Sequence, residues 1–444
     1  MIARAAENSE FALVSDEFVK IYRRALNERP YIPVGKVCNK QQPGEFHTPS
    51  KGNDRSSCPK DVIRPAQFVT HCPWGHPHKL KFERRAPMSG HEILIAVMAA
   101  FAALGALDRI LGNRFGIGKE FEEGILAMGS LAMAMIGVIT LAPVLAAVLK
   151  PVVVPVFGFL GADAAMFAGS ILACDMGGGP LAAQMTADPE AALLGGVITG
   201  SMLGATLVFT VPVAMGILEE EDRPAMAKGI LCGIVTIPVG ILVGGLVAGF
   251  QPAMVFRNLI PIVLIGALIA LGLWKAEDAM IRGFAGFGKG VVALITAGLA
   301  LSIVQELTGF VILPGMAPIS DGFHTVGEIA IVLAGAFPLV AVLTRLLKKP
   351  LVTLGKILGV NDVSAAGLVA SLANSIATFG MVKEMDKRGK VVNIAFAVSA
   401  AFVFGDHLGF TAGFAPEMLP AMIAGKLAGG ISAVAVALWL TRKA

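Results

Sequence analysis

The feature that most constrains the fold is a succession of apolar segments that begins at Glu92 and continues almost to the C-terminus. Many of these segments are close to the roughly 20 residues that a helix needs to cross a hydrocarbon core of about 30 Å. Their approximate ranges are 92–111, 124–149, 152–160, 164–178, 190–217, 225–249, 258–274, 289–311, 327–347, 363–381, 391–412 and 418–440. The segments lack the ten-residue alternation of membrane β-strands. The pattern predicts an all-α polytopic membrane protein with about ten to eleven transmembrane helices.

Composition supports this fold class. Hydrophobic residues make up 55% of the chain, charged residues make up 15%, and the mean hydropathy is +0.74. A soluble domain has roughly 45–50% apolar and about 25% charged residues. No long basic block indicates binding to nucleic acid, and the five scattered cysteines have no disulfide-type spacing. The sequence predicts a lipid bilayer as the protein's surroundings and carries no indication of its oligomeric state.

Residues 1–87 differ from the rest of the chain. They contain 15 Lys and Arg against 9 Asp and Glu, and they include several prolines. This basic excess before the first span favours a cytoplasmic N-terminus. We expect the segment to be a disordered polar extension, and the sequence that follows Met88 resembles a bacterial gene start, so the extension is not necessarily native. A His/Cys tract at 71–78 has the residue types of a metal site but lacks a second ligand pair, so we predict no metal.

Residues 88–444 form the predicted membrane domain, with an internal repeat near 124–250 and 327–441. Lys150-Pro151 aligns with Lys349-Pro350, and residues 160–163 align with 358–361 at an offset of 198. The same offset brings Gly169 opposite Gly367. The short segments 152–160, 164–178 and 363–381 are therefore interpreted as half-helices or re-entrant pieces, one set in each half. Transporters build a site at the membrane midplane from such broken helices.

Polar residues inside the apolar segments are the candidate site residues. Asp175 precedes Gly177-Gly178-Gly179-Pro180, and Asp406-His407 is flanked by Gly405 and Gly409. The repeat places Asp175-Met176 opposite Ala373-Asn374, which makes Asn374 a further candidate. A charge within a membrane segment costs roughly 2.5–3.5 kcal/mol on insertion scales, which makes a functional role the default hypothesis. The alternative is a pair that only fastens two helices, with Lys426 as a further partner. Asp163 and Asn361-Asp362 are predicted to cap helices, and Glu122 and Glu123 to complement a helix dipole.

The missing aromatic residues indicate the kind of ligand. After Met88 there is no tyrosine, and the tryptophans are Trp274 and Trp439, near span ends. A quaternary ammonium is usually held in a cage of Trp and Tyr. A small protonated amine, a metal cation or a proton fits these carboxylates better.

The chain from about Met88 onwards resembles the ethanolamine permeases of bacterial ethanolamine-utilisation operons. The matching residues are Phe121-Glu122-Glu123-Gly124, Met166-Phe167-Ala168-Gly169, Leu172-Ala173-Cys174-Asp175-Met176-Gly177-Gly178, the stretch 386–390 running into 396–402, and Gly405-Asp406-His407-Leu408-Gly409-Phe410. The sequence departs from the family pattern at Gly179-Pro180 and at Ser375, and residues 1–87 have no counterpart.

The resemblance implies a multi-pass protein of the bacterial inner membrane that takes up ethanolamine without a cofactor, as the protonated amine at low external pH. Asp175, Asp406, His407 and Asn374 are the substrate-binding residues that we infer from their burial. The rival hypothesis is an ion- or proton-coupled carrier of another small solute. An intramembrane aspartyl protease is disfavoured because that enzyme family has a tyrosine before one aspartate, where Cys174 and Gly405 stand here. The protein is therefore not predicted to be an enzyme.

Overall fold

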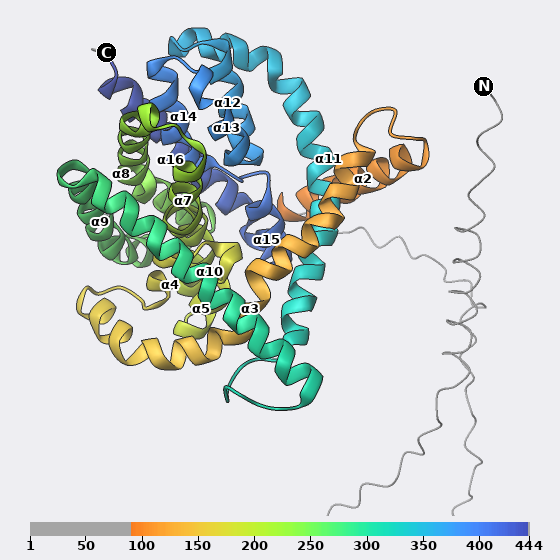
Figure 1. The fold of residues 1–444 in the computed structure, drawn as a ribbon, viewed down its shortest axis with the longest axis vertical. Coiled ribbons are helices and arrows are strands. Elements are labelled where there is room, and N and C mark those ends of the chain that lie inside the picture. Colours follow the sequence, from red (N-terminus) through yellow and green to blue (C-terminus); the bar gives the residue numbers. More distant parts are fainter. Residues whose placement is uncertain (1–89, 443–444) are drawn as a thin grey trace, which may run out of the picture. The chain divides into compact units, whose positions relative to one another are not determined.

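The computed structural model describes residues 90–442, apart from several side chains between 347 and 356. The predictions for residues 1–87 and the His/Cys tract lie outside the described residues. Within the described part the secondary structure is helical, with no strand (Figure 1). The continuous helices are α2 (Gly90–Ile110), α3 (Gly118–Phe159), α8 (Arg223–Val247), α9 (Pro252–Lys275), α10 (Glu277–Thr308), α11 (Ile319–Leu358) and α16 (Leu419–Leu440). A further helix runs through Pro189–Ile217.

Among residues 90–442, these eight helices are long and apolar enough to cross a membrane. Large apolar side chains such as Val148, Leu268 and Ile331 point outward and are more than two-thirds exposed. Such a surface is stable in lipid, where each helix satisfies its own backbone hydrogen bonds. The predicted class, an all-α polytopic membrane protein, is confirmed.

Two of the remaining apolar segments form pairs of short helices. The first pair is α4 (Ala165–Ile171) and α5 (Gly178–Met185), joined by a 3₁₀ turn, Cys174–Met176. The second is α12 (Asp362–Ala373) and α13 (Ser375–Met381), joined at Asn374. Within each pair the two helices pack against one another. None of these four short helices is long enough to span the bilayer alone. In each pair the chain reverses its direction inside the protein between the first and the second helix.

A third break divides the apolar stretch that the sequence predicted as one span, 391–412. Helix α14 (Lys387–Ala400) ends there, and α15 (Asp406–Phe414) begins after five residues. The irregular backbone between them is satisfied by α12, because the N–H groups of Phe402 and Phe404 donate to the carbonyls of Ser371 and Leu372. Non-helical backbone at membrane depth is tolerated where protein covers it in this way.

The helix through Pro189–Ile217 is also irregular. It begins as α6 (Pro189–Leu193), where the Asp188 carboxylate caps the first turn, and it ends as α7 (Val211–Ile217). Between them, Leu194–Gly204 and Thr206–Thr210 are wound as π-helix. We call Leu194–Gly204 the π-helical segment. It packs closely on α4, since Gly169 lies against Gly195 and Gly204 against Leu172. Such departures from α-helical winding are frequent at functional sites.

The two halves contain the same order of elements. Each has a long helix with internal prolines (α3 or α11), then a pair of short helices, an irregular helix and a final long helix (α8 or α16). The long helices of the two halves are antiparallel, because Gly124 of α3 meets Leu333 of α11 while Gly322 of α11 meets Ile136 of α3. Helices α8 and α16 also pack together (Figure 1). This order agrees with the internal duplication, which stays a prediction and whose orientation the sequence left open.

One predicted break is wrong. The segment 152–160, expected to be a separate half-helix, is the C-terminal part of α3, which continues through Pro143, Pro151 and Pro155. A proline removes one backbone hydrogen bond and bends a helix, but flanking turns that remain bonded can carry the helix past it.

Candidate functional site

The first helix pair and the break between α14 and α15 meet at one point in the interior. Asp175 lies in the turn between α4 and α5, and His407 lies in the first turn of α15. His407 Nε2 is 3.7 Å from Asp175 Oδ1, and the two side chains are 4% and 14% exposed. Residues 232 positions apart in the chain are thus in contact. The structure thus brings Asp175 into contact with His407, which follows the third predicted site residue, Asp406.

A small cavity of about 30 Å³ lies beside this pair. Asp406 faces it together with Asp175 and His407, and its other walls are Ala173, Met176, Ala205, Phe209 and Phe402. The Phe402 ring packs edge-on against Phe209 at 5.3 Å and lies 5.3 Å from the His407 ring. This volume holds about one or two water molecules. A larger ligand therefore requires the walls to move.

The local sequence produces these breaks through unusual backbone conformations. Gly177 ends the turn of Asp175 with φ of 96°, a left-handed conformation that glycine adopts without strain. Phe402 also has a positive φ, 62°, which is uncommon for a bulky residue. Gly405 packs so closely on Ala373 that a Cβ atom would stand 2.2 Å from the Ala373 carbonyl oxygen. The site therefore rests on a backbone that ordinary helix-forming residues would not adopt.

Two further groups belong to this cluster, and the sequence did not assign either to the site. The ligand atoms of Cys174, Asp175 and His407 all lie within 4.8 Å of one another, which would suit a metal ion. Lys426 of α16 is buried nearby, since it contacts Ser201, and the adjacent Gly200 packs on Cys174. Its positive charge opposes metal binding. Its ammonium donates to the Ser201 carbonyl oxygen at 2.5 Å, and no ion pair between Lys426 and Asp406 is found among the described residues.

Asp406 also faces a second, larger cavity of about 430 Å³. Its lining includes three ionisable side chains from α3 and α11, namely Glu120, Glu123 and Arg345. Asn374 is found here, not in the small cavity, and its Oδ1 accepts a hydrogen bond from the Ile376 N–H at 2.8 Å. Asn374 therefore caps α13 and lies with Asp406 rather than with Asp175.

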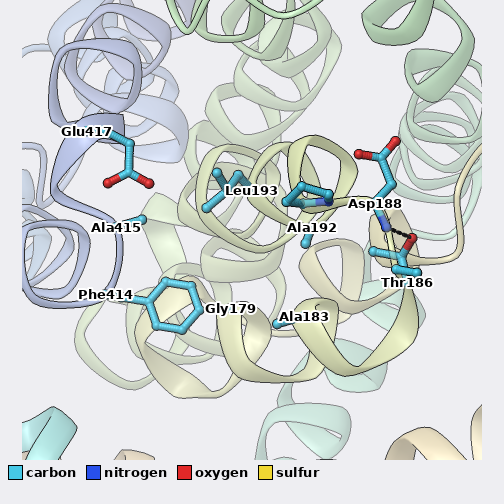
Figure 2. A pocket seen from close by; sticks show the side chains of 11 residues that line it. Gly179, Ala183, Thr186, Asp188, Ala192, Leu193, Phe414, Ala415 and Glu417 are labelled. Carbon is cyan, nitrogen blue, oxygen red and sulfur yellow. Dashed lines mark hydrogen bonds between the residues drawn. The ribbon is translucent and has the colours of Figure 1, made fainter.

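A third cavity, of about 370 Å³, borders α5, α6 and the end of α15 (Figure 2). The Phe414 ring faces Gly179 there, and the carboxylates of Asp188 and Glu417 stand at its rim. Phe414 stacks on the buried Phe410 with 5.0 Å between ring centroids. A Cβ atom on Gly179 would stand 2.6 Å from Phe410, so the absence of a side chain at this position makes room for the ring.

The two residues predicted to cap helices make the expected hydrogen bonds. Asp163 caps α4, since its carboxylate accepts from the Ala165 N–H at 2.8 Å and from the Thr186 hydroxyl at 2.8 Å. Asn361 caps α12 by accepting from the Ser364 N–H at 2.9 Å. Glu122 pairs with Arg109 and Glu123 with Lys119 near the beginning of α3.

Comparisons with known proteins cover most of the membrane region. The family described as "Ethanolamine utilisation protein, EutH" matches residues 91–440. A "Probable ethanolamine permease EutH" of Listeria monocytogenes is 58% identical over 356 residues, which cover 80% of this chain and 95% of that protein. The protein of the same name from Escherichia coli is 47% identical over 394 residues, with 80% and 97% covered. The "Uncharacterized protein YxeR" of Bacillus subtilis is 51% identical, with 80% and 96% covered. No solved structure matches the chain significantly.

Proposed function

The chain belongs to the EutH family of ethanolamine utilisation proteins, and we propose that it carries ethanolamine across the membrane as the protonated ethanolammonium ion. The observation that carries this proposal is the meeting of Asp175 and Asp406 around one small interior cavity. Two carboxylates inside a membrane protein attract a small cation. The relatives named as permeases connect this site with ethanolamine.

The chemistry of the walls supports a primary ammonium ion. Its three N–H donors need hydrogen-bond acceptors, which Asp175 and Asp406 supply. Among the described residues that line the cavity, the phenylalanines are Phe209 and Phe402, which are less suited than Trp and Tyr to a fully methylated ammonium. His407 Nδ1 is buried and lacks a hydrogen-bond partner among the described residues, so it is free to bind the hydroxyl end of the ligand. We assign Asp175, Asp406 and His407 to binding, with Asn374 on the approach.

The arrangement of the three cavities supports a route through the protein. Asp406 faces both the small cavity and the larger cavity that contains Glu120 and Glu123. From the small cavity, the chain that follows Met176 leads to Gly179, which borders the third cavity with Asp188 and Glu417. Both outer cavities contain carboxylates, which raise the local concentration of cations.

We place the protein in the bacterial inner membrane as a transporter, not an enzyme, in line with its relatives. Transport matters most at low external pH. The neutral amine crosses lipid by itself, and its fraction falls as the pH falls. A carrier of the protonated form is then the remaining route.

The test is uptake of labelled ethanolamine by a strain that lacks its own permease, with and without this chain, at acidic and alkaline external pH. We expect the chain to raise uptake strongly at acidic pH and little at alkaline pH. Equal uptake with and without the chain at acidic pH would contradict the proposal. Collapsing the sodium or proton gradient distinguishes facilitated uptake, which continues, from the rival ion-coupled carrier, which stops.

A further inference from the structure

Lys426 is the most unusual charged residue in the described part of the chain. It lies in the middle of α16 with 1% of its surface exposed, although lysine is seldom fully buried. Its ammonium donates to the Ser201 carbonyl oxygen in the π-helical segment and is not within ion-pair distance of a carboxylate among the described residues. One hydrogen bond to a neutral carbonyl does not balance a buried charge. The balancing charge must come from groups somewhat farther away.

Those groups are the ones that surround the small cavity. Ser201, which accepts from the Lys426 ammonium, follows Gly200, and Gly200 packs against the backbone of Cys174, the residue before Asp175. Asp175 in turn lines the small cavity together with Asp406 and His407. Counted at their ordinary charges, with His407 and Cys174 neutral, two carboxylates and one ammonium leave a single negative charge. The cluster is therefore one positive charge short of neutrality, and one ethanolammonium ion supplies it.

We propose that Lys426 is a fixed internal cation that limits this site to ligands with one positive charge. Without it, two carboxylates facing one small cavity would favour a doubly charged ligand or two monovalent ions. With it, the second positive charge of a short diamine would be repelled by a buried ammonium in surroundings that screen charges poorly. Lys426 is on this view a specificity-determining residue of the site, and the proposal rests on the function proposed above.

A purely structural role makes a different prediction. If Lys426 only ties α16 to the π-helical segment through Ser201, its replacement lowers stability and total uptake but leaves the relative strength of competing ligands unchanged. The charge preference of the site therefore separates the two roles.

The experiment measures inhibition of labelled ethanolamine uptake by two ligands of equal length. Propanolamine has one positive charge, whereas trimethylenediamine has a second amine in place of the hydroxyl and two positive charges at neutral pH. For the wild-type chain we expect propanolamine to inhibit at a concentration at least about tenfold lower than trimethylenediamine. The ratio of these two inhibitory concentrations measures the charge preference. In Lys426→Met this ratio should fall at least about tenfold, because the repelling charge is gone. Lys426→Arg, which keeps the charge, should preserve the wild-type ratio.

Three results would overturn the proposal. The first is an unchanged ratio of inhibitory concentrations in a Lys426→Met variant that accumulates normally. The second is loss of the preference for propanolamine in Lys426→Arg. The third is equal inhibition of the wild-type chain by both ligands. If Lys426→Met fails to fold, equal inhibition of the wild-type chain by both ligands or loss of the preference in Lys426→Arg still refutes the proposal. Absence of ethanolamine uptake by the wild-type chain would instead refute the proposed function, so the two failures are distinct.

Discussion

Replacing Asp175 by asparagine is the most direct test of the binding site. The substitution keeps the size of the side chain and removes one of the two carboxylates that face the small cavity. Asp175 is 14% exposed, so the effective dielectric constant that applies is far below that of water. At about 4 Å and an effective dielectric constant of about 20, a carboxylate attracts an ammonium ion by about 4 kcal/mol.

Part of this attraction survives the substitution. The asparagine oxygen still accepts a hydrogen bond from the ligand, which is worth about 1 kcal/mol. The expected loss is then about 3 kcal/mol, which corresponds to an affinity lower by about 100-fold. In purified protein reconstituted into vesicles, the ethanolamine concentration for half-maximal uptake should rise by that factor, while the amount of folded protein stays normal.

Asp278→Asn is the matched control for this measurement. Asp278 is an exposed aspartate in the first turn of α10, far in the sequence from the site residues. We expect it to leave the half-maximal concentration unchanged. If Asp175→Asn, present at a normal level, raises that concentration by less than about threefold, which is under 1 kcal/mol, then the carboxylate does not bind the ammonium and the assignment is refuted.

Two further predictions concern stability, measured as the thermal unfolding midpoint of the detergent-solubilised protein. Gly177→Ala should lower the midpoint more than Gly249→Ala. Both glycines have a positive φ, which costs alanine about 1–2 kcal/mol. Only at Gly177 would the added Cβ atom also clash, because it would stand 1.9 Å from Val138. Equal shifts would show that the contact with Val138 relaxes freely. Asp163→Ala should lower the midpoint because it removes the cap of α4 and the hydrogen bond from Thr186, at a cost of about 1–3 kcal/mol. The ethanolamine concentration for half-maximal uptake should stay unchanged. A large rise in that concentration would give Asp163 a role in binding.

Much of the architecture could be predicted from local patterns. Hydropathy marks membrane helices because a helix in lipid must satisfy its backbone within its own segment, so the signal is contained in each stretch of sequence. The caps at Asp163 and Asn361 were predictable for the same reason, since a cap involves residues two or three positions away. The break beside Asp175 was predictable from the glycines that follow it.

Other breaks were not predictable in this way. The sequence separated 124–149 from 152–160, where α3 in fact continues. It also predicted 391–412 as one span, although the chain breaks before α15. That break exists because the carbonyls at the end of α12 accept hydrogen bonds from the irregular backbone around Phe402. Whether a strained conformation is stabilised depends on a partner from elsewhere in the chain, which local sequence does not describe.

The sequence by itself determined that this chain is a bundle of membrane helices with costly polar residues at Asp175, Asp406 and His407. Only the tertiary structure decided which of these residues meet. It joined Asp175 to His407, assigned Asn374 to the neighbouring cavity, and turned Lys426 toward Ser201. The physical reason is that hydropathy and helix capping act over a few residues. The charge balance of a buried site, in contrast, is the sum over side chains that packing brings together from distant helices.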